Sequence, residues 1–355
     1  MKILVAISGG VDSAVAAHIL KSQGHSITGA MMKIYSGKSC GNALGSCYGT
    51  DKSAEIADAK KNCDFIGCDF HLVDVSDEFD KLVFTKFKSE YLNARTPNPC
   101  VLCNPLIKFG AFPNKLMQMG IAFDKFATGH YVRCEFDSDI GKYKLLRGAN
   151  YKKDQSYFLY ALTQEKLSKI IFPLGTMDKE DVRKYALEHN IPVALKRDSQ
   201  DFYSGSYSDL FDESVESGDI VDTFGNVLGK HRGLCNYTIG QRKGLFIAYS
   251  EPLYVVGFDK ENNRLIVSTK DDTYAQGLIA SNANWILDIP HKKFDAQVKI
   301  RSSQQPFNCL IYPSDDGVRV LFDTPQSAVA PGQAAVFYQG DTVLGGATIT
   351  SSIKA

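Results

Sequence analysis

A short run near the N-terminus has the residue types that bind a phosphate group. Residues 8–13 read Ser-Gly-Gly-Val-Asp-Ser, after the apolar run 3–7 and at the start of 11–23, whose apolar residues have helical spacing. Glycine lets the backbone approach a ligand because no Cβ stands in the way. The N–H groups at the start of a helix attract anions. The sequence therefore predicts a phosphate-binding loop between a buried strand and a helix.

The loop differs from the two commonest nucleotide motifs. A Walker loop needs a Lys-Ser/Thr pair after its glycines, but the next lysine is Lys21, and no G-x-G-x-x-G pattern is present. The run 8–13 resembles the pyrophosphate loop of the ATP pyrophosphatase (PP-loop) family, which adenylates a substrate oxygen and releases pyrophosphate. The structural alternative is a plain glycine turn in an α/β protein.

Alternating strands and helices are expected over residues 1–204. This βαβ order predicts an α/β fold with a doubly wound parallel sheet, of the adenine-nucleotide hydrolase-like type. The expected strands are 25–32, 69–75 and 123–129, and the expected helices are 52–63 and 78–94. The loop 8–13 would then lie at the carboxyl edge of this sheet.

The pattern changes at about residue 205, where strands become short and turn residues frequent. We expect a small central β-rich domain at 205–275 and a C-terminal β-barrel at 276–355. A chain of 355 residues is also too long for one ordinary core.

Charge and cysteine content limit the partners. The chain has 40 basic and 40 acidic residues, so a nucleic acid would need a local basic surface. No apolar run approaches the roughly 18 residues that a membrane span needs. Nine cysteines, an odd number, and a chain that begins in a core strand favour reduced thiols and a cytoplasmic protein without a membrane partner.

Several further motifs identify a more specific resemblance. In order and spacing they resemble the bacterial tRNA-specific 2-thiouridylase family (MnmA) over nearly the whole chain. The motifs are 96–104, 107–109, 127–131, 153–159, 196–201, 237–245 and 331–338. The resemblance implies a tRNA-uridine 2-sulfurtransferase. It would adenylate the C2 oxygen of the wobble uridine and replace that oxygen with sulfur, while the barrel helps to hold the tRNA.

The resemblance also assigns site residues. The ATP-binding positions would be Ser8, Gly9, Gly10, Val11, Asp12, Ser13, Met32 and Gly129. The tRNA-binding positions would be Asn98, Pro99, His130, Lys153, Asp154, Gln155, Arg301, Ser302 and Gln333. Asp12 is the expected Mg²⁺ ligand, since hard cations prefer carboxylate oxygen. The implied partners are tRNAs of the Lys, Glu and Gln types and a sulfur donor protein or free sulfide.

Two departures from the family pattern concern sulfur delivery. Cys103 matches the family cysteine that forms a disulfide as sulfur is released, but the family's second catalytic cysteine falls at Tyr203. A phenol cannot carry a persulfide. The family usually has aspartate where this chain has Cys100. A cysteine is lost at one essential position and gained at another. This exchange favours a changed route of sulfur delivery over random loss of the catalytic residues.

Two routes remain open for the pair. In one, Cys100 and Cys103 carry and release sulfur as a C-x-x-C couple. In the other, they are metal ligands of a [4Fe–4S] cluster whose open iron binds hydrosulfide, with Cys235, Cys134 or Cys47 as the third ligand. An inert Cys100 and a zinc site are weaker alternatives.

The alternatives for the whole chain come from other functional classes. A catalytically silent tRNA-binding paralogue would keep Gln333 and the basic contacts without a sulfur route. A different pyrophosphatase reaction, such as amidation, would need an amine or glutaminase site. The retained loop 8–13 argues against the first, and the sequence offers no such site for the second.

Overall fold

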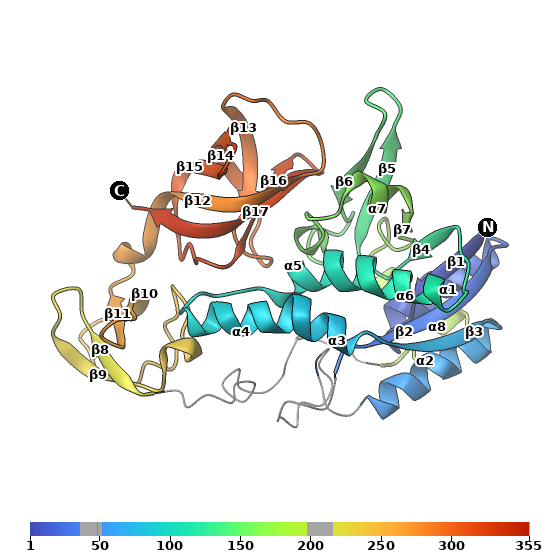
Figure 1. The fold of residues 1–355 in the computed structure, drawn as a ribbon, viewed down its shortest axis with the longest axis horizontal. Coiled ribbons are helices and arrows are strands. Elements are labelled where there is room, and N and C mark those ends of the chain that lie inside the picture. The colour runs from blue at the N-terminus through green and yellow to red at the C-terminus, as the bar shows by residue number, and fades with distance from the viewer. Residues whose placement is uncertain (36–47, 49–51, 197–215, 355) are drawn as a thin grey trace. The chain divides into compact units, whose positions relative to one another are not determined.

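The computed structural model describes residues 1–35, 48, 52–196 and 216–354 (Figure 1). The chain divides into two compact units. The first unit comprises 1–83, 100–204 and 341–344, and the second comprises 84–99, 205–340 and 345–355. Tyr203, on which a sequence prediction falls, lies outside the described residues.

A five-stranded parallel sheet forms the centre of the first unit. Its strand order is β3-β2-β1-β4-β7, with every pairing parallel. The strands are β1 Lys2–Ala6, β2 Ser26–Lys33, β3 Asp69–Asp74, β4 Lys125–Ala127 and β7 Ile170–Ile171. Ile3, Leu4 and Val5 of β1 are almost fully buried, as expected for a central parallel strand. The α/β prediction is confirmed.

Helices lie between these strands in sequence, and one more follows the last of them. They are α1 Val11–Ser22, α2 Ser53–Ile66, α6 Phe112–Gln118, α7 Gln164–Ser168 and α8 Lys179–Glu188. Between α6 and α7 lie the antiparallel hairpin β5 Val132–Asp137 and β6 Lys142–Arg147 and the short turn η3 Ser156–Phe158.

The helix expected at 78–94 is interrupted. It consists of α3 Ser76–Phe79, the π-helical segment η1 Asp80–Phe84 and α4 Thr85–Leu92. The boundary between the two units falls inside η1, after Val83. A second π-helical segment, η2 Asn104–Ala111, follows the short helix α5 Pro99–Cys103. The apolar pattern alone contains no signal for either change of helical pitch.

Two β structures make up most of the second unit. A four-stranded sheet of order β10-β11-β8-β9 covers the predicted central module. Its strands are β8 Gly218–Val221, β9 Val227–His231, β10 Tyr254–Asp259 and β11 Arg264–Ser268, with the short turns η5 Leu234–Asn236 and η6 Asp271–Thr273. Its core includes Ile220, Val255 and Leu265.

The C-terminal strands form a closed antiparallel barrel. Its six strands run in the order β12-β15-β14-β13-β16-β17, and pairing of β12 with β17 closes the ring. They are β12 Tyr274–Trp285, β13 Phe294–Lys299, β14 Phe307–Ser314, β15 Gly317–Ser327, β16 Ala334–Gln339 and β17 Thr342–Ile353. The barrel prediction is confirmed. No helix in the described part of the chain is long and apolar enough to span a membrane.

Candidate active site

The loop after β1 is held by its own serines. Ser13 Oγ donates to the Gly10 carbonyl at 3.0 Å and accepts from the Ser8 N–H at 3.0 Å. Gly9 has a φ of +74°, and a Cβ there would lie 2.4 Å from the Glu55 carbonyl oxygen of α2. Glycine is therefore needed at position 9 for both its conformation and its space. The loop lies between β1 and α1 as predicted, and its phosphate-binding role stays a prediction.

Asp12 carries two contacts that the sequence did not suggest. Its Oδ1 accepts from the Tyr131 hydroxyl at 2.7 Å and from the Lys179 ammonium at 2.6 Å. Lys179 is only 8 % exposed and also lies 5.8 Å from the centre of the Tyr131 ring. A cation in the first turn of a helix opposes the helix dipole, so its place at the start of α8 is explained by its pairing with Asp12.

A cleft of about 480 Å³ opens beside this loop. Ligand pockets commonly have volumes of roughly 300–1,000 Å³. Its lining includes five of the predicted nucleotide residues, namely Ser8, Asp12, Ser13, Met32 and Gly129. His130, Lys108 and Gln155 line it as well. A Cβ at Gly129 would lie 2.9 Å from the Asp12 carbonyl carbon, so a glycine is required where β4 ends against α1.

His130 forms a buried part of the cleft wall. Its Nδ1 lies 2.7 Å from the Thr128 hydroxyl, and its ring contacts Phe109 and Phe172. Burial, and then the nearby Lys108 ammonium, hold its pKa well below the ordinary value for histidine. His130 is therefore neutral at physiological pH. It is available as a hydrogen-bonding group and not as a cation for phosphate.

Cys100 and Cys103 lie one helical turn apart on α5, and both are half-buried. Side chains three residues apart on a helix are neighbours, with Cβ atoms about 5–6 Å apart. Asn104 anchors this turn, since its Nδ2 donates to the Cys100 carbonyl at 3.0 Å and to the Phe158 carbonyl at 3.3 Å. The geometry places two thiols at the start of the π-helical segment η2.

The described residues do not provide a third ligand for a cluster at this pair. No group of three or more His, Cys, Asp or Glu side chains suited to a metal ion occurs in the described ranges. Burial raises the pKa of the Cys134 thiol to about 11 and also raises the pKa of Cys235. Cys47 lies outside the described residues. The described residues around Cys100 and Cys103 therefore do not fit a [4Fe–4S] cluster or a structural zinc ion.

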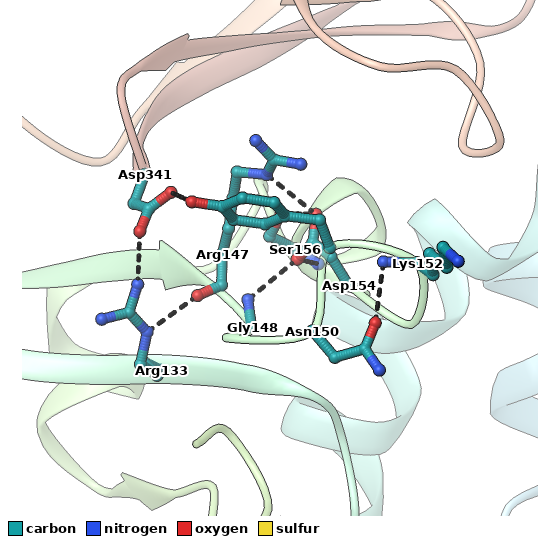
Figure 2. A network of polar contacts seen from close by, with 9 residues as sticks. Arg133, Arg147, Gly148, Asn150, Lys152, Asp154, Ser156 and Asp341 are labelled. Atoms are coloured by element: carbon teal, nitrogen blue, oxygen red, sulfur yellow. Dashed lines mark hydrogen bonds and ion pairs between the residues drawn. The ribbon is translucent and has the colours of Figure 1, made fainter. Parts of the chain in front are cut away.

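The segment that follows β6 contains three predicted tRNA residues in different settings, of which Figure 2 shows Asp154. Lys153 is exposed. The side chain of Asp154 is fully buried, and its Oδ1 accepts from the Gly148 and Ser156 N–H groups at 3.1 and 3.0 Å. The Asp154 carboxylate therefore shapes this loop and does not face solvent. Gln155 lines the nucleotide cleft, and its Oε1 accepts from the Tyr131 N–H at 2.9 Å.

A second set of polar contacts, centred on Asp341, holds the loop that follows β6. The Asp341 carboxylate accepts from Arg133 at 2.7 Å and from the Tyr151 hydroxyl at 2.9 Å, as Figure 2 shows. The Arg147 guanidinium stacks 4.0 Å from the Tyr151 ring centre and lies 3.5 Å from Asp154. These contacts fix the loop on which the lysine side chains stand.

The remaining predicted tRNA residues belong to the second unit. Arg301 donates to the Ile239 and Ala328 carbonyls at 2.9 and 3.2 Å, so its guanidinium joins two loops of that unit. The other four are half-buried or buried residues of the same unit: Asn98, Pro99, Ser302 and Gln333. Their assignments remain predictions.

Comparison with known proteins identifies the family. Family models match residues 1–203 ("tRNA methyl transferase HUP domain"), 212–269 ("tRNA methyl transferase PRC-barrel domain") and 275–349 ("Aminomethyltransferase beta-barrel domain"). A curated protein of Endomicrobium trichonymphae named tRNA-specific 2-thiouridylase MnmA is 46 % identical, covering 98 % of this chain and 99 % of its own. The chain belongs to the tRNA-specific 2-thiouridylase (MnmA) family.

Other members of the MnmA family match over the same length. The tRNA-specific 2-thiouridylase of Acetivibrio thermocellus is 42 % identical over 98 % of this chain and 99 % of its own, and that of Pelobacter propionicus is 44 % identical over 100 % and 99 %. A solved 4-thiouridine synthetase–RNA complex with bound ATP covers 55 % of this chain and 42 % of its own, with 16 % identity and a TM-score of 0.35.

Two partners of Asp12 escaped sequence reasoning. Tyr131 follows the Gly-His pair at the end of a strand, and only the position of the strand end could have suggested a role for its hydroxyl. Lys179 lies 167 residues from Asp12 along the chain. Its one signal is electrostatic, since a lysine in the first turn of a predicted helix needs a compensating anion.

Proposed function

We propose that this protein is an ATP-dependent tRNA-uridine 2-sulfurtransferase that acts in the cytoplasm. It adenylates the C2 oxygen of the wobble uridine and replaces that oxygen with sulfur, delivered through Cys100 and Cys103. One observation carries the proposal. The first unit contains both a cleft beside the PP-loop, which Ser8 and Ser13 close by hydrogen bonds, and a helical turn with two thiols, Cys100 and Cys103. The proposed substrates are tRNAs of the Lys, Glu and Gln types, and the proposed sulfur source is a donor protein or sulfide.

The cleft supplies the activation step. The loop N–H groups from Ser8 to Ser13 bind the phosphates. Asp12 has the hard carboxylate donor that suits Mg²⁺, and that ion would neutralise phosphate charge. Lys179 balances the charge of Asp12, to which it donates at 2.6 Å. The uridine oxygen attacks the α-phosphorus, the bond to the β-phosphate oxygen breaks, and pyrophosphate leaves.

Sulfur transfer uses the two thiols in turn. A donor protein's persulfide passes its outer sulfur to the Cys100 thiolate and leaves as the donor thiol, whereas free hydrosulfide forms the same Cys100 persulfide only by opening the oxidised Cys100–Cys103 disulfide, with the Cys103 thiolate as leaving group. The terminal sulfur of the Cys100 persulfide attacks the activated C2, and AMP leaves with the former uridine oxygen. The Cys103 thiolate then attacks the Cys100 sulfur. This attack forms a Cys100–Cys103 disulfide and releases the 2-thiouridine. An external thiol reductant restores the pair. A helical turn that places the thiols side by side supports this route without a cluster.

The decisive experiment separates activation from sulfur transfer. The protein is incubated with a wobble-uridine tRNA, ATP, Mg²⁺, and sulfide or a cysteine desulfurase with cysteine. Pyrophosphate and 2-thiouridine are then measured separately. The wild-type protein should form both products. Cys103→Ser should lower 2-thiouridine by at least about 10³-fold and still release pyrophosphate, because only the second step needs the thiol.

The same assay tests the alternatives. Full 2-thiouridine formation by Cys103→Ser would overturn the sulfur route. A wild-type protein that binds tRNA and releases no pyrophosphate would be the silent paralogue. Cys309→Ser provides the control, since this buried cysteine lies in β14 of the barrel and has no part in the proposed reaction.

A further inference from the structure

A second pair of cysteines lies where α2 ends and β3 begins. The helix ends at Gly67, which has left-handed dihedrals of 70° and 55°. The Cys68 N–H donates to the Cys63 carbonyl at 3.0 Å, and the Gly67 N–H donates to the Asp64 carbonyl at 3.2 Å. This is the hydrogen-bond pattern of a Schellman motif, in which the side chains of these two positions meet. Both positions here are cysteines.

Both sulfur atoms converge on Gly29 in β2. A Cβ at Gly29 would lie 2.4 Å from Cys63 Sγ, so the cysteine fills the space of the missing side chain. The Gly29 N–H hydrogen bonds to the Cys68 sulfur, and the two thiols hydrogen bond to each other. They are not joined by a disulfide. The Schellman turn and the missing side chain of Gly29 thus bring the two thiols together beside β2.

The two thiols differ in environment. Cys63 is fully buried, and its hydrogen bond to Cys68, followed by burial, raises its pKa. Cys68 is half-buried, and its hydrogen bond from Cys63 lowers its pKa despite the opposing effect of burial. The Lys21 ammonium, 3.0 Å from the Gly67 carbonyl, contributes in the same direction. A more exposed thiol with a lowered pKa beside a buried thiol with a raised pKa is the usual pairing of a reactive and a resolving cysteine.

We propose that Cys68 is a peroxide-modification site that Cys63 resolves into an intramolecular disulfide. The Cys68 thiolate attacks one oxygen of a hydroperoxide, the O–O bond breaks, and Cys68 becomes a sulfenic acid while the leaving oxygen takes a proton. The Cys63 sulfur then attacks the Cys68 sulfur, the S–O bond breaks, and water leaves with the Cys63 proton. The two thiols are oxidised by two electrons in total, and the hydroperoxide is reduced. This chemistry is independent of the tRNA reaction.

Peptide mass spectrometry tests the proposal on the full chain. The protein is treated with limiting hydrogen peroxide, its remaining thiols are alkylated, and it is digested with trypsin. Cys63 and Cys68 fall in one peptide, 62–81, and Cys100 and Cys103 fall in another, 96–108. We expect peptide 62–81 to lose two hydrogen atoms without alkylation and to recover both alkylation sites after dithiothreitol. Cys134, whose pKa is raised to about 11, should oxidise at least about 10-fold more slowly.

Two serine variants assign the roles. In Cys63→Ser, Cys68 should stop at the sulfenic acid and accumulate a dimedone adduct. In Cys68→Ser, Cys63 should remain reduced and alkylated after unfolding. The proposal is overturned if peptide 62–81 keeps both thiols when Cys134 has been oxidised. It is also overturned if Cys63→Ser gives no dimedone adduct at Cys68, or if Cys68 pairs with a cysteine of another peptide.

Discussion

The nucleotide cleft and the Cys100/Cys103 pair are held in place in different ways. In the cleft, Asp12 is fixed by a tyrosine and a lysine from distant elements, and Gly9 and Gly129 sit where a Cβ would collide with neighbouring backbone. The cysteine pair stands on one five-residue helix. Changes in the cleft disturb several elements at once, whereas a thiol on a short helix can be exchanged with little cost to packing. We therefore expect substitutions in the cleft to affect folding as well as activity, and substitutions of the two thiols to affect activity alone.

The largest expected effect comes from exchanging the sulfur residues. Cys100→Ala should lower 2-thiouridine formation to background, because one thiol cannot both carry and release sulfur. The double variant Cys100→Asp/Tyr203→Cys restores the usual family pattern, and it should regain a substantial part of the activity. Both products are quantified by nucleoside mass spectrometry after digestion of the tRNA.

Single substitutions complete this test. Tyr203→Cys alone should remain active, because it adds a thiol and removes none. Full activity of Cys100→Ala would mean that Cys100 takes no part, and the contrast between the two regions would lose its basis.

A smaller effect is expected from the lysine behind Asp12. Lys179→Met removes the cation at 2.6 Å from the carboxylate, and it should slow pyrophosphate release by about 10²-fold through lost charge stabilisation. Lys184→Met is the matched control, since this lysine stands on the same helix with a side chain 75 % exposed. If both variants released pyrophosphate at the wild-type rate, Lys179 would be a purely structural partner of Asp12.

The close approach of β4 to α1 gives the next test. Gly129→Ala places a methyl group 2.9 Å from the Asp12 carbonyl carbon, and the strain should cost about 1–3 kcal/mol of stability and weaken ATP binding. Urea unfolding and ATP titration measure the two effects. Gly229→Ala, where the nearest neighbouring atom is a side-chain carbon at 3.5 Å, should change neither. Equal behaviour of the two variants would contradict the tight packing of the cleft.

How much the sequence could predict follows from the distance between interacting residues. The loop was predictable because the hydrogen bonds that close it on itself join residues at most five apart, such as Ser8 and Ser13. The strands and the barrel were predictable from apolar period and turn residues. The Asp12–Lys179 pair was not, because it joins elements brought together only by the fold. The burial of the Asp154 side chain was not either, because its partners are close in sequence but no pattern distinguishes a carboxylate that turns inward from one that faces solvent. Motif matching marks Asp154 as important, but it cannot tell a carboxylate that shapes a loop from one that contacts RNA.

The smallest expected effect concerns the neutral histidine of the cleft wall. His130 has a lowered pKa in the folded protein and the ordinary value of 6.5 when unfolded, so the unfolded state binds the proton more readily. Its contribution to stability is complete above pH 6.5 and is lost as the pH falls, by about 1.4 kcal/mol for each pH unit. Urea unfolding between pH 7.5 and 5.5 should show this loss, and His130→Asn should reduce it. The same substitution at the exposed His291 should leave the slope unchanged. A steeper acid loss in His130→Asn than in wild type would mean that a group other than this histidine controls the acid stability of the cleft.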